Sequence, residues 1–289
     1  MGRGRSAPEG RRPERHPDRG AVDPLTTVSP EGGRTVWLTL AYEGTELHGW
    51  QVQPGLATVQ GLLMEAAARV LGGPVKITGA SRTDAGVHAF RQVASLATSS
   101  AVAPAALQRA LNALLPPAVR VLDAREAPAG FDARRWARGK RYAYLIDCGP
   151  QADPFLRRYA WHAPFPLDSD TMAAGLAALR GKHDFSAFCA SAGRDRTPFC
   201  TITSARVVAR RERLVICLSA DSFLHHMVRN IVGSLVEVGR GARRPGWIGE
   251  VVDGRDRKRA GPTAPAQGLV LVRVLYGPEA RARATEERP

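Results

Sequence analysis

The chain has 289 residues and a formal net charge of +14. The two terminal segments, residues 1–34 and 276–289, contribute only +2 of this charge, so most of it lies in the body of the chain. This length suggests one large domain or two moderate ones, and a basic body indicates a polyanionic partner, although a genome rich in arginine codons gives the same composition. No run of about 18 apolar residues and no C-x-x-C pair occurs, which argues against a membrane span, a zinc ribbon and a redox motif.

The first half of the chain alternates between strand-like and helix-like segments. Residues 1–33 are rich in Gly, Pro, Arg and Glu, so we expect a disordered tail there, and residues 278–289 predict another. Thr58 is the expected N-cap of the first helix. The elements predicted between the tails are strands at 36–42, 75–78, 92–96 and 119–123 and helices at 58–71 and 104–115.

The second half loosely repeats this order. Each half reads as β-α-β-β-α-β, the ferredoxin-like unit. We predict an α+β fold in which two ferredoxin-like halves, 34–140 and 141–277, join into one mixed or antiparallel sheet. Helices cover one face, and a central active-site cleft is expected on the other. The predicted elements are strands at 141–146, 201–208, 214–219 and 269–274, helices at 168–179 and 223–238, and a short helix around Trp247.

The densest polar segment is GASRTDAGVHA at 79–89, between two predicted strands. Arg82 and Asp84 lie two residues apart, so in an extended segment their side chains point the same way. The alternative is an ordinary loop with a turn-forming Asp and a surface Arg, and the composition of this segment alone favours that alternative.

Other segments of the sequence favour a functional role for this loop. They read YEGTELHGWQVQ at 42–53, GKHDFSAF at 181–188, FLHHMVRNIVG at 223–233 and APAQGLVL at 264–271. With GASRTDAGVHA they resemble the tRNA pseudouridine synthase A family, and the resemblance runs from about Arg34 to Tyr276. The blocks are long, ordered and correctly spaced, whereas a lone T-D-A-G would be a weak signal.

The resemblance implies a role for each motif residue. Asp84 matches the catalytic aspartate, Tyr142 the tyrosine that stacks on the target uracil, and Arg229 the arginine that pairs with the aspartate. Leu269 matches an apolar residue of the pocket, and Arg82 is expected to contact the RNA near the flipped nucleotide. The implied activity is isomerisation of uridine to pseudouridine on the 3′ side of the anticodon stem and loop of tRNA, by a homodimer of two-domain subunits.

The reaction fits these residue types. It breaks the C1′–N1 bond, turns the uracil and rejoins it through C5, so no cofactor or metal is expected. Asp84 can attack C1′ or abstract a C2′ proton, and Arg229 offsets the cost of burying its charge. Tyr142 can hold the turning base, and its phenol could take the C5 proton if its pKa allows. The base must be flipped out of a stacked stem.

Basic clusters are expected to bind the RNA phosphates, although a solvated surface explains any single member equally well. One departure concerns residues 131–134, which read FDAR where the family commonly has F-H-A-R. Asp132 is therefore expected to weaken or relocate one RNA contact without touching the catalytic residues. The clusters are Arg134, Arg135, Arg138, Lys140 and Arg141, then Arg157 and Arg158, and finally Arg240, Arg243 and Arg244.

The same features predict the binding partner and the cellular compartment. The expected partner is tRNA, with no membrane and no small-molecule cofactor. The four scattered cysteines read as reduced thiols, and no apolar signal peptide is seen, so we expect a cytoplasmic protein.

Two other classes of function compete with this interpretation. A non-catalytic RNA-binding protein on the same scaffold explains the charge but not the combination of Asp, Tyr and Arg. An RNA-cleaving hydrolase needs a second acid or a metal, and His88, His225 and His226 show neither H-E-x-x-H spacing nor a cysteine partner. Product analysis separates the three, because the RNA would be isomerised, intact or cut.

Overall fold

A computed structural model describes residues 1–2, 33–190 and 197–280 of the chain. The strands are β1 (Arg34–Tyr42), β2 (Lys76–Gly79), β3 (His88–Thr98), β4 (Val119–Glu126), β5 (Ala137–Asp147), β6 (Trp161–His162), β7 (Gly181–Asp184), β8 (Phe199–Arg210), β9 (Arg213–Ala220) and β10 (Leu269–Tyr276). The α-helices are α1 (Val59–Leu71), α2 (Pro104–Leu114), α3 (Ser169–Ala177), α4 (Met227–Gly239) and α5 (Trp247–Gly254). None of these helices combines the length and apolar composition needed to cross a bilayer.

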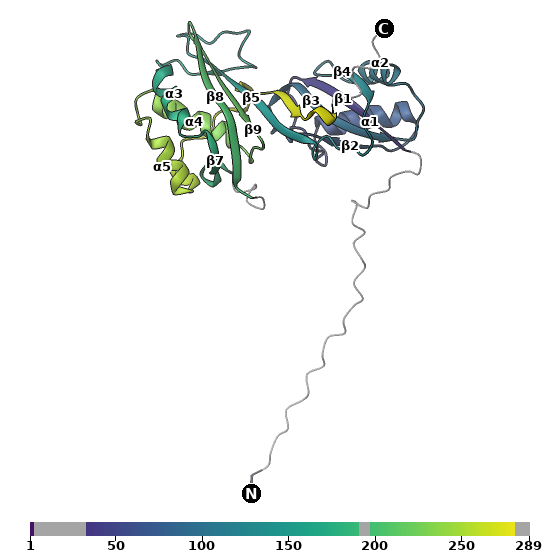
Figure 1. Cartoon of the computed structure of the whole chain (residues 1–289), viewed down its shortest axis with the longest axis horizontal. Coiled ribbons are helices and arrows are strands. Elements are labelled where there is room, and N and C mark those ends of the chain that lie inside the picture. The colour runs from purple at the N-terminus through teal and green to yellow at the C-terminus, as the bar shows by residue number, and fades with distance from the viewer. Residues whose placement is uncertain (3–32, 191–196, 281–289) are drawn as a thin grey trace.

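All the described strands belong to one sheet, in the order β4-β1-β3-β10-β5-β9-β8-β7, with β2 paired to β3 and β6 to β5. The first half therefore has the order β4-β1-β3-β2, and the second half repeats it as β10-β5-β9-β8. Figure 1 shows α1 and α2 at one end of the molecule and α3, α4 and α5 at the other. The predicted α+β fold, two ferredoxin-like halves sharing one mixed sheet, is confirmed.

Local sequence explains where the helices begin and end. The Thr58 hydroxyl accepts a hydrogen bond from the Gly61 N–H, which confirms the predicted cap of α1, and Gly72 ends that helix with a φ of +78°. Pro104 opens α2, where its missing N–H costs nothing. Asp168 caps α3 by accepting from two backbone N–H groups of its first turn.

The main core lies between the sheet and the helices. Alternate residues of the strands, such as Leu38 on β1 and Tyr144 on β5, pack there with helix residues such as Leu63 and Leu235. A smaller apolar cluster covers part of the opposite face, and in it Trp37 stacks on a phenylalanine, Phe131, at 4.4 Å between ring centroids. The helices therefore cover one face of the sheet, as expected.

The two halves meet along β3, whose edge has two partners in succession. β2 pairs with β3 as far as Gly79 opposite Ala94. Further along, β10 takes over the same edge in parallel, with Val270 opposite His88. Residues 80–87 connect β2 to β3 at this change of partner, so the sheet itself places the motif loop at the centre of the molecule.

Some predicted boundaries differ from the structure. The helix expected from Phe223 begins at Met227, because His226 adopts a left-handed conformation with a φ of +60°. The short strands β6 and β7 were not predicted. Residues 278–280, assigned to the C-terminal tail, instead form a 3-10 turn with a buried alanine. The remaining tail residues, 3–32 and 281–289, lie outside the described residues.

Candidate active site

The loop that carries Asp84 is held by the segment after β1. The N–H of Trp50, a buried residue, donates to the Thr83 carbonyl over 3.0 Å. Gly49 has a φ of +82°, and a Cβ on it would lie 2.5 Å from the Thr83 oxygen, so only glycine allows the two backbones to approach this closely. The G-W-Q motif is therefore a support for the Asp84 loop.

Buried side chains fix the same loop from the sheet. The amide of Gln92, a fully buried residue of β3, accepts from the Ser81 N–H at 3.2 Å and donates to the Ser81 carbonyl at 2.7 Å. The hydroxyls of Tyr42 and Thr83 lie 2.8 Å apart. Gln92, Tyr42 and Thr83 are all buried, which strengthens these bonds and helps to hold the loop in one conformation.

His88, the histidine of the same motif, is a structural residue. Its Nδ1 accepts from the Gly44 N–H at 2.9 Å, while Nε2 lies 2.8 Å from the Arg158 carbonyl and 3.1 Å from the Gln267 carbonyl. Burial lowers the pKa of His88 below its ordinary value, against the opposing charge of Glu43. His88 thus ties the Y-x-G-T segment to the junction of β3 and β10.

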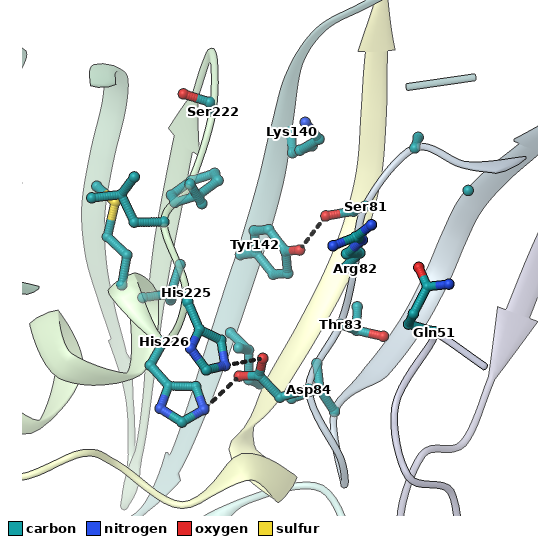
Figure 2. A pocket seen from close by; sticks show the side chains of 18 of the residues that line it. Gln51, Ser81, Arg82, Thr83, Asp84, Lys140, Tyr142, Ser222, His225 and His226 are labelled. Carbon is teal, nitrogen blue, oxygen red and sulfur yellow. Dashed lines mark hydrogen bonds and ion pairs between the residues drawn. The ribbon is translucent and has the colours of Figure 1, made fainter. Parts of the chain in front are cut away.

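A pocket of about 760 Å³ opens beside this loop, between the two halves. Asp84, Arg82, Tyr142 and Leu269 all line it, and Figure 2 shows Arg82, Asp84 and Tyr142 around the same space. Arg229 does not line the pocket but bonds to Asp84. The structure therefore brings together all five residues singled out by the sequence.

The position of the pocket corrects one expectation. Tyr142 shares its face of β5 with Tyr144 and Ile146, which are buried in the main core beneath the helices. The pocket therefore opens on the helix-covered face, between the helices of the two halves, and not on the opposite face. The sheet face opposite is partly filled by the smaller cluster around Trp37.

Three side chains from α4 and the turn before it meet the Asp84 carboxylate. Arg229 Nη1 lies 3.4 Å from Oδ2, His226 Nε2 lies 3.5 Å from Oδ2, and His225 Nε2 lies 3.6 Å from Oδ1. Arg229 is itself fixed by Nε, which donates to the Ala264 carbonyl over 2.8 Å. The A-P-A-Q-G segment thus holds the arginine of M-V-R-N beside the Asp84 carboxylate.

The two histidines reach the same carboxylate because of an unusual backbone. Neighbouring side chains diverge by about 100° in a helix and point to opposite faces in a strand. The left-handed conformation of His226 instead brings its ring to 4.0 Å from that of His225, and both point toward Asp84 in Figure 2. Such a conformation costs about 1–3 kcal/mol and is typical of functional sites. Both histidines were predicted to lie on a helix and were given no role at the site. Their position directly before M-V-R-N, the motif of Arg229, was a signal that they lie near Asp84.

Tyr142 forms part of the pocket wall. Its hydroxyl lies 2.8 Å from the Ser81 hydroxyl, and its ring meets the edge of Phe223 at 5.1 Å between centroids. Burial raises the pKa of Tyr142 to about 12, with the Ser81 hydrogen bond opposing and the Asp84 charge reinforcing that shift. The phenol is therefore protonated at neutral pH.

One of the predicted basic clusters reaches the pocket. Arg134 and Lys140 line it, close in sequence to the position where Asp132 replaces the usual histidine. The Asp132 carboxylate accepts from the backbone N–H groups of Arg134 and Arg135, both at 2.8 Å. Asp132 therefore caps the turn that carries Arg134, which gives this substitution a structural role.

Three arginines of the other predicted clusters pair with acidic side chains. Arg158 pairs with two glutamates of the segment after β1. Arg240 and Arg244 pair with Glu237 and Glu250 near the C-terminal end of α4. Arg229 lies in the first turn of that helix and Arg240 directly follows its end, so the two are about 17 Å apart along the helix axis.

Asp84, His225 and His226 also have the composition of a metal-binding group, since their ligand atoms all lie within 4.8 Å of one another. The Arg229 guanidinium, however, already faces the same carboxylate oxygen as His226. A fixed cation there repels a second one, so we assign the cluster to a polar network around the Asp84–Arg229 ion pair and not to a metal.

Comparisons with known proteins point to one family. A family model described as tRNA pseudouridine synthase matches residues 39–134 and 176–277. Proteins named tRNA pseudouridine synthase A from Myxococcus xanthus and Solibacter usitatus are 45 % and 44 % identical over 247 residues; each alignment covers 84 % of this chain, and 93 % and 100 % of the relatives. A chain of an archaeal box H/ACA sRNP Nop10-Cbf5 complex, 9 % identical, covers 78 % of this chain and 59 % of its own length with a TM-score of 0.33, too low to support an argument.

Proposed function

Because the chain belongs to the tRNA pseudouridine synthase family, we propose that it isomerises uridine to pseudouridine in the anticodon stem and loop of tRNA, with Asp84 as its catalytic carboxylate. The chain is accordingly an isomerase. The observation that supports the assignment of Asp84 is its contact with Arg229 at the wall of a pocket that also holds Tyr142.

Asp84 acts on the ribose of the flipped nucleotide. It either attacks C1′ or removes a C2′ proton, and in both cases the C1′–N1 bond breaks and the uracil leaves with the bonding electrons. Both routes need an ionised carboxylate in a site with little water. Arg229 supplies the compensating charge, and its second bond to Ala264 keeps the guanidinium in place when the substrate enters.

The detached uracil turns against an apolar and aromatic wall. Tyr142 offers a ring held by Ser81 and Phe223, and Leu269, at the start of β10, closes the pocket beside it. A ring face holds a planar base without fixing one orientation, so the base can present C5 to C1′ after its rotation.

Positive side chains at the pocket edge hold the RNA. Arg82 is exposed there, and Arg134 and Lys140 line the same pocket from the turn before β5 and from β5 itself. Contacts of this kind with phosphates supply binding energy, and a flipped nucleotide can then reach Asp84.

The oligomeric state, location and domain division are further parts of the proposal. The resemblance to the family supports a homodimer, and the tRNA substrate supports a cytoplasmic location. We place the N-terminal pseudouridine synthase domain, with Asp84, at 34–140 and the C-terminal one at 141–277, since the first range contains β1 to β4 and the second contains most of β5 with β8, β9 and β10. Light scattering coupled to gel filtration would test the dimer.

Product analysis tests the proposed activity. Unmodified tRNA transcripts are incubated with the protein, digested to nucleosides and separated by liquid chromatography with mass detection after a label that marks pseudouridine. Conversion of uridine in the anticodon arm is the expected result. Intact, unmodified tRNA that binds tightly would indicate a non-catalytic RNA-binding protein, and cut tRNA would indicate a hydrolase.

A further inference from the structure

If the chain has the proposed function, on which this inference rests, its reaction needs a group that accepts the C5 proton of the uracil. Once C1′ has joined C5, that carbon carries both the ribose and its original hydrogen, which must leave. Tyr142 is poorly suited, because burial raises its pKa to about 12 and its phenol remains protonated. Among the described residues that line the pocket, the other acceptors are two carboxylates and three histidines.

The two carboxylates are both engaged. Asp84 is the group that acts on the ribose, and its Oδ2 faces Arg229 and His226. Burial alone would raise the pKa of Asp221, but hydrogen bonds from Thr201 and Ser222 bring it below its ordinary value, so it is a weak base. The histidines of the pocket lining are the remaining acceptors.

His225 has the geometry of a proton acceptor. Its side chain is 38 % exposed, more than that of His226 at 28 %, so it has the greater access to a bound base. Its Nε2 faces Oδ1 of Asp84 at 3.6 Å, whereas Arg229 and His226 share Oδ2. The hydrogen bond from the Ala190 N–H to the His225 carbonyl, 3.0 Å long, fixes the backbone of the turn.

We propose that His225 accepts the C5 proton of the rotated uracil at Nε2, with Asp84 stabilising the resulting imidazolium. The C5–H bond breaks and its electron pair forms the C5–C6 double bond. The C6–N1 double bond becomes single, and N1 takes a proton from solvent as His225 returns its own to solvent. In the route through C1′ attack, Asp84 is again a carboxylate when C5 has bonded, so its charge is available at this step.

His226 has a different role. It is a positioning residue that shares Oδ2 with Arg229 and holds the left-handed turn on which His225 is mounted. Burial lowers the pKa of His226, and so do His225, Arg229 and Arg257, while Asp84 opposes them. A neutral His226 leaves the negative charge of Asp84 available to the imidazolium of His225.

A deuterium isotope effect isolates the step assigned to His225. Single-turnover formation of pseudouridine is measured with tRNA transcripts that carry uridine or [5-²H]uridine, for the wild type and for His225→Gln, His226→Gln and His48→Gln. His48 is the matched control, because it is the third histidine of the pocket lining. Circular dichroism and tRNA affinity verify that each variant folds and binds.

For His225→Gln we expect the rate to fall by about 10²-fold or more and the isotope effect to rise above the wild-type value, because C5 deprotonation becomes rate-limiting. In His226→Gln the rate falls without that rise. An unchanged isotope effect in His225→Gln would overturn the proposal. A rise of the isotope effect in His226→Gln or His48→Gln, and not in His225→Gln, would overturn it as well. Absence of pseudouridine with the wild type would instead contradict the proposed function itself.

A second variant covers the case in which His225→Gln does not fold. In His225→Gly, free imidazole added to the buffer is expected to restore part of the lost rate in proportion to its unprotonated fraction. His226→Gly serves as the control for a site opened by glycine. Failure of imidazole to rescue a folded, tRNA-binding His225→Gly would count against proton transfer by this side chain.

Discussion

The guanidinium of Arg229 lies 3.4 Å from the Asp84 carboxylate, although 145 positions separate the two residues in the sequence. Asp84 lies on the loop between β2 and β3 in the first half, and Arg229 lies in the first turn of α4 in the second. The pair therefore exists only when β10 joins the two halves against β3. The site is therefore complete only in the assembled sheet.

Arg229 is predicted to contribute both charge and position. Arg229→Lys keeps the charge but loses the bond from Nε to Ala264, so kcat should fall roughly 10- to 150-fold, as for loss of a charged hydrogen bond of about 1.5–3 kcal/mol. Arg229→Met should lose more, since it leaves the Asp84 carboxylate without its cation. Steady-state kinetics on tRNA measures both, with Arg240→Met at the other end of α4 as the control. Wild-type turnover by Arg229→Lys would refute the positioning role.

Tyr142 is predicted to act through its ring and not through its phenol. Tyr142→Phe keeps the ring and loses one hydrogen bond to Ser81, worth about 1 kcal/mol, so it should retain roughly a fifth of the turnover or more. Tyr142→Leu should lose far more, because no ring remains to hold the uracil. If the two variants were equally impaired in single-turnover assays, the hydroxyl would be the essential group.

The same tyrosine predicts how stability depends on pH. Its pKa is raised to about 12 in the folded protein, against about 10 in an unfolded chain. Between these values the unfolded chain has lost the proton that the folded one keeps, so the free energy of unfolding falls as pH rises from 10 to 12. Urea denaturation across this range should show a smaller fall for Tyr142→Phe than for the wild type.

Gly49 is predicted to be essential for the shape of the Asp84 loop. An alanine there would put its Cβ 2.5 Å from the Thr83 oxygen, and the backbone φ is +82°. Gly49→Ala should therefore lower both the melting temperature and the turnover. Gly55→Ala is a matched control, because Gly55 also has a positive φ, +72°, but open space around its Cβ position. Equal effects of the two substitutions would show that strain at φ, and not the close approach to Thr83, explains the loss.

Binding of tRNA is predicted to weaken steeply with salt, because phosphate contacts release counterions. Lys140 lines the pocket, so Lys140→Ala should weaken binding and reduce the slope of log K against log salt by about 1. Lys258→Ala, an exposed lysine outside the pocket lining, should leave the slope unchanged. A flat salt response of the wild type would contradict RNA binding through this basic edge.

Much of the fold could be predicted because local signals agree with one another. Thr58 was predicted as the N-cap of α1 and is confirmed as such, and the helices predicted from Pro104 and Asp168 begin at Pro104 and directly after Asp168. Apolar periodicity then separates helices from strands. The short strand β6 was missed because two residues carry too little pattern, and β7 was missed because its sequence, GKHD, contains no β-branched or large apolar residue.

The arrangement of the site was harder to predict, because it depends on non-local geometry. The side on which the pocket opens follows from the face of β5 that carries Tyr142, and strand alternation does not say which face the helices cover. The sharing of the β3 edge by β2 and β10 is likewise absent from any single segment. His225 and His226 fit a helical pattern, and only the left-handed turn at His226 reveals that both face Asp84.

The most direct test of the central claim is release of tritium from tRNA that carries [5-³H]uridine, by the wild type and by Asp84→Asn side by side. Asparagine has nearly the same shape but no charge to act on the ribose, so Asp84→Asn should fold, bind tRNA and release no tritium, while the wild type releases it from the anticodon arm. Release by Asp84→Asn at the wild-type rate would contradict the role of Asp84, and no release by either protein would contradict the reaction itself.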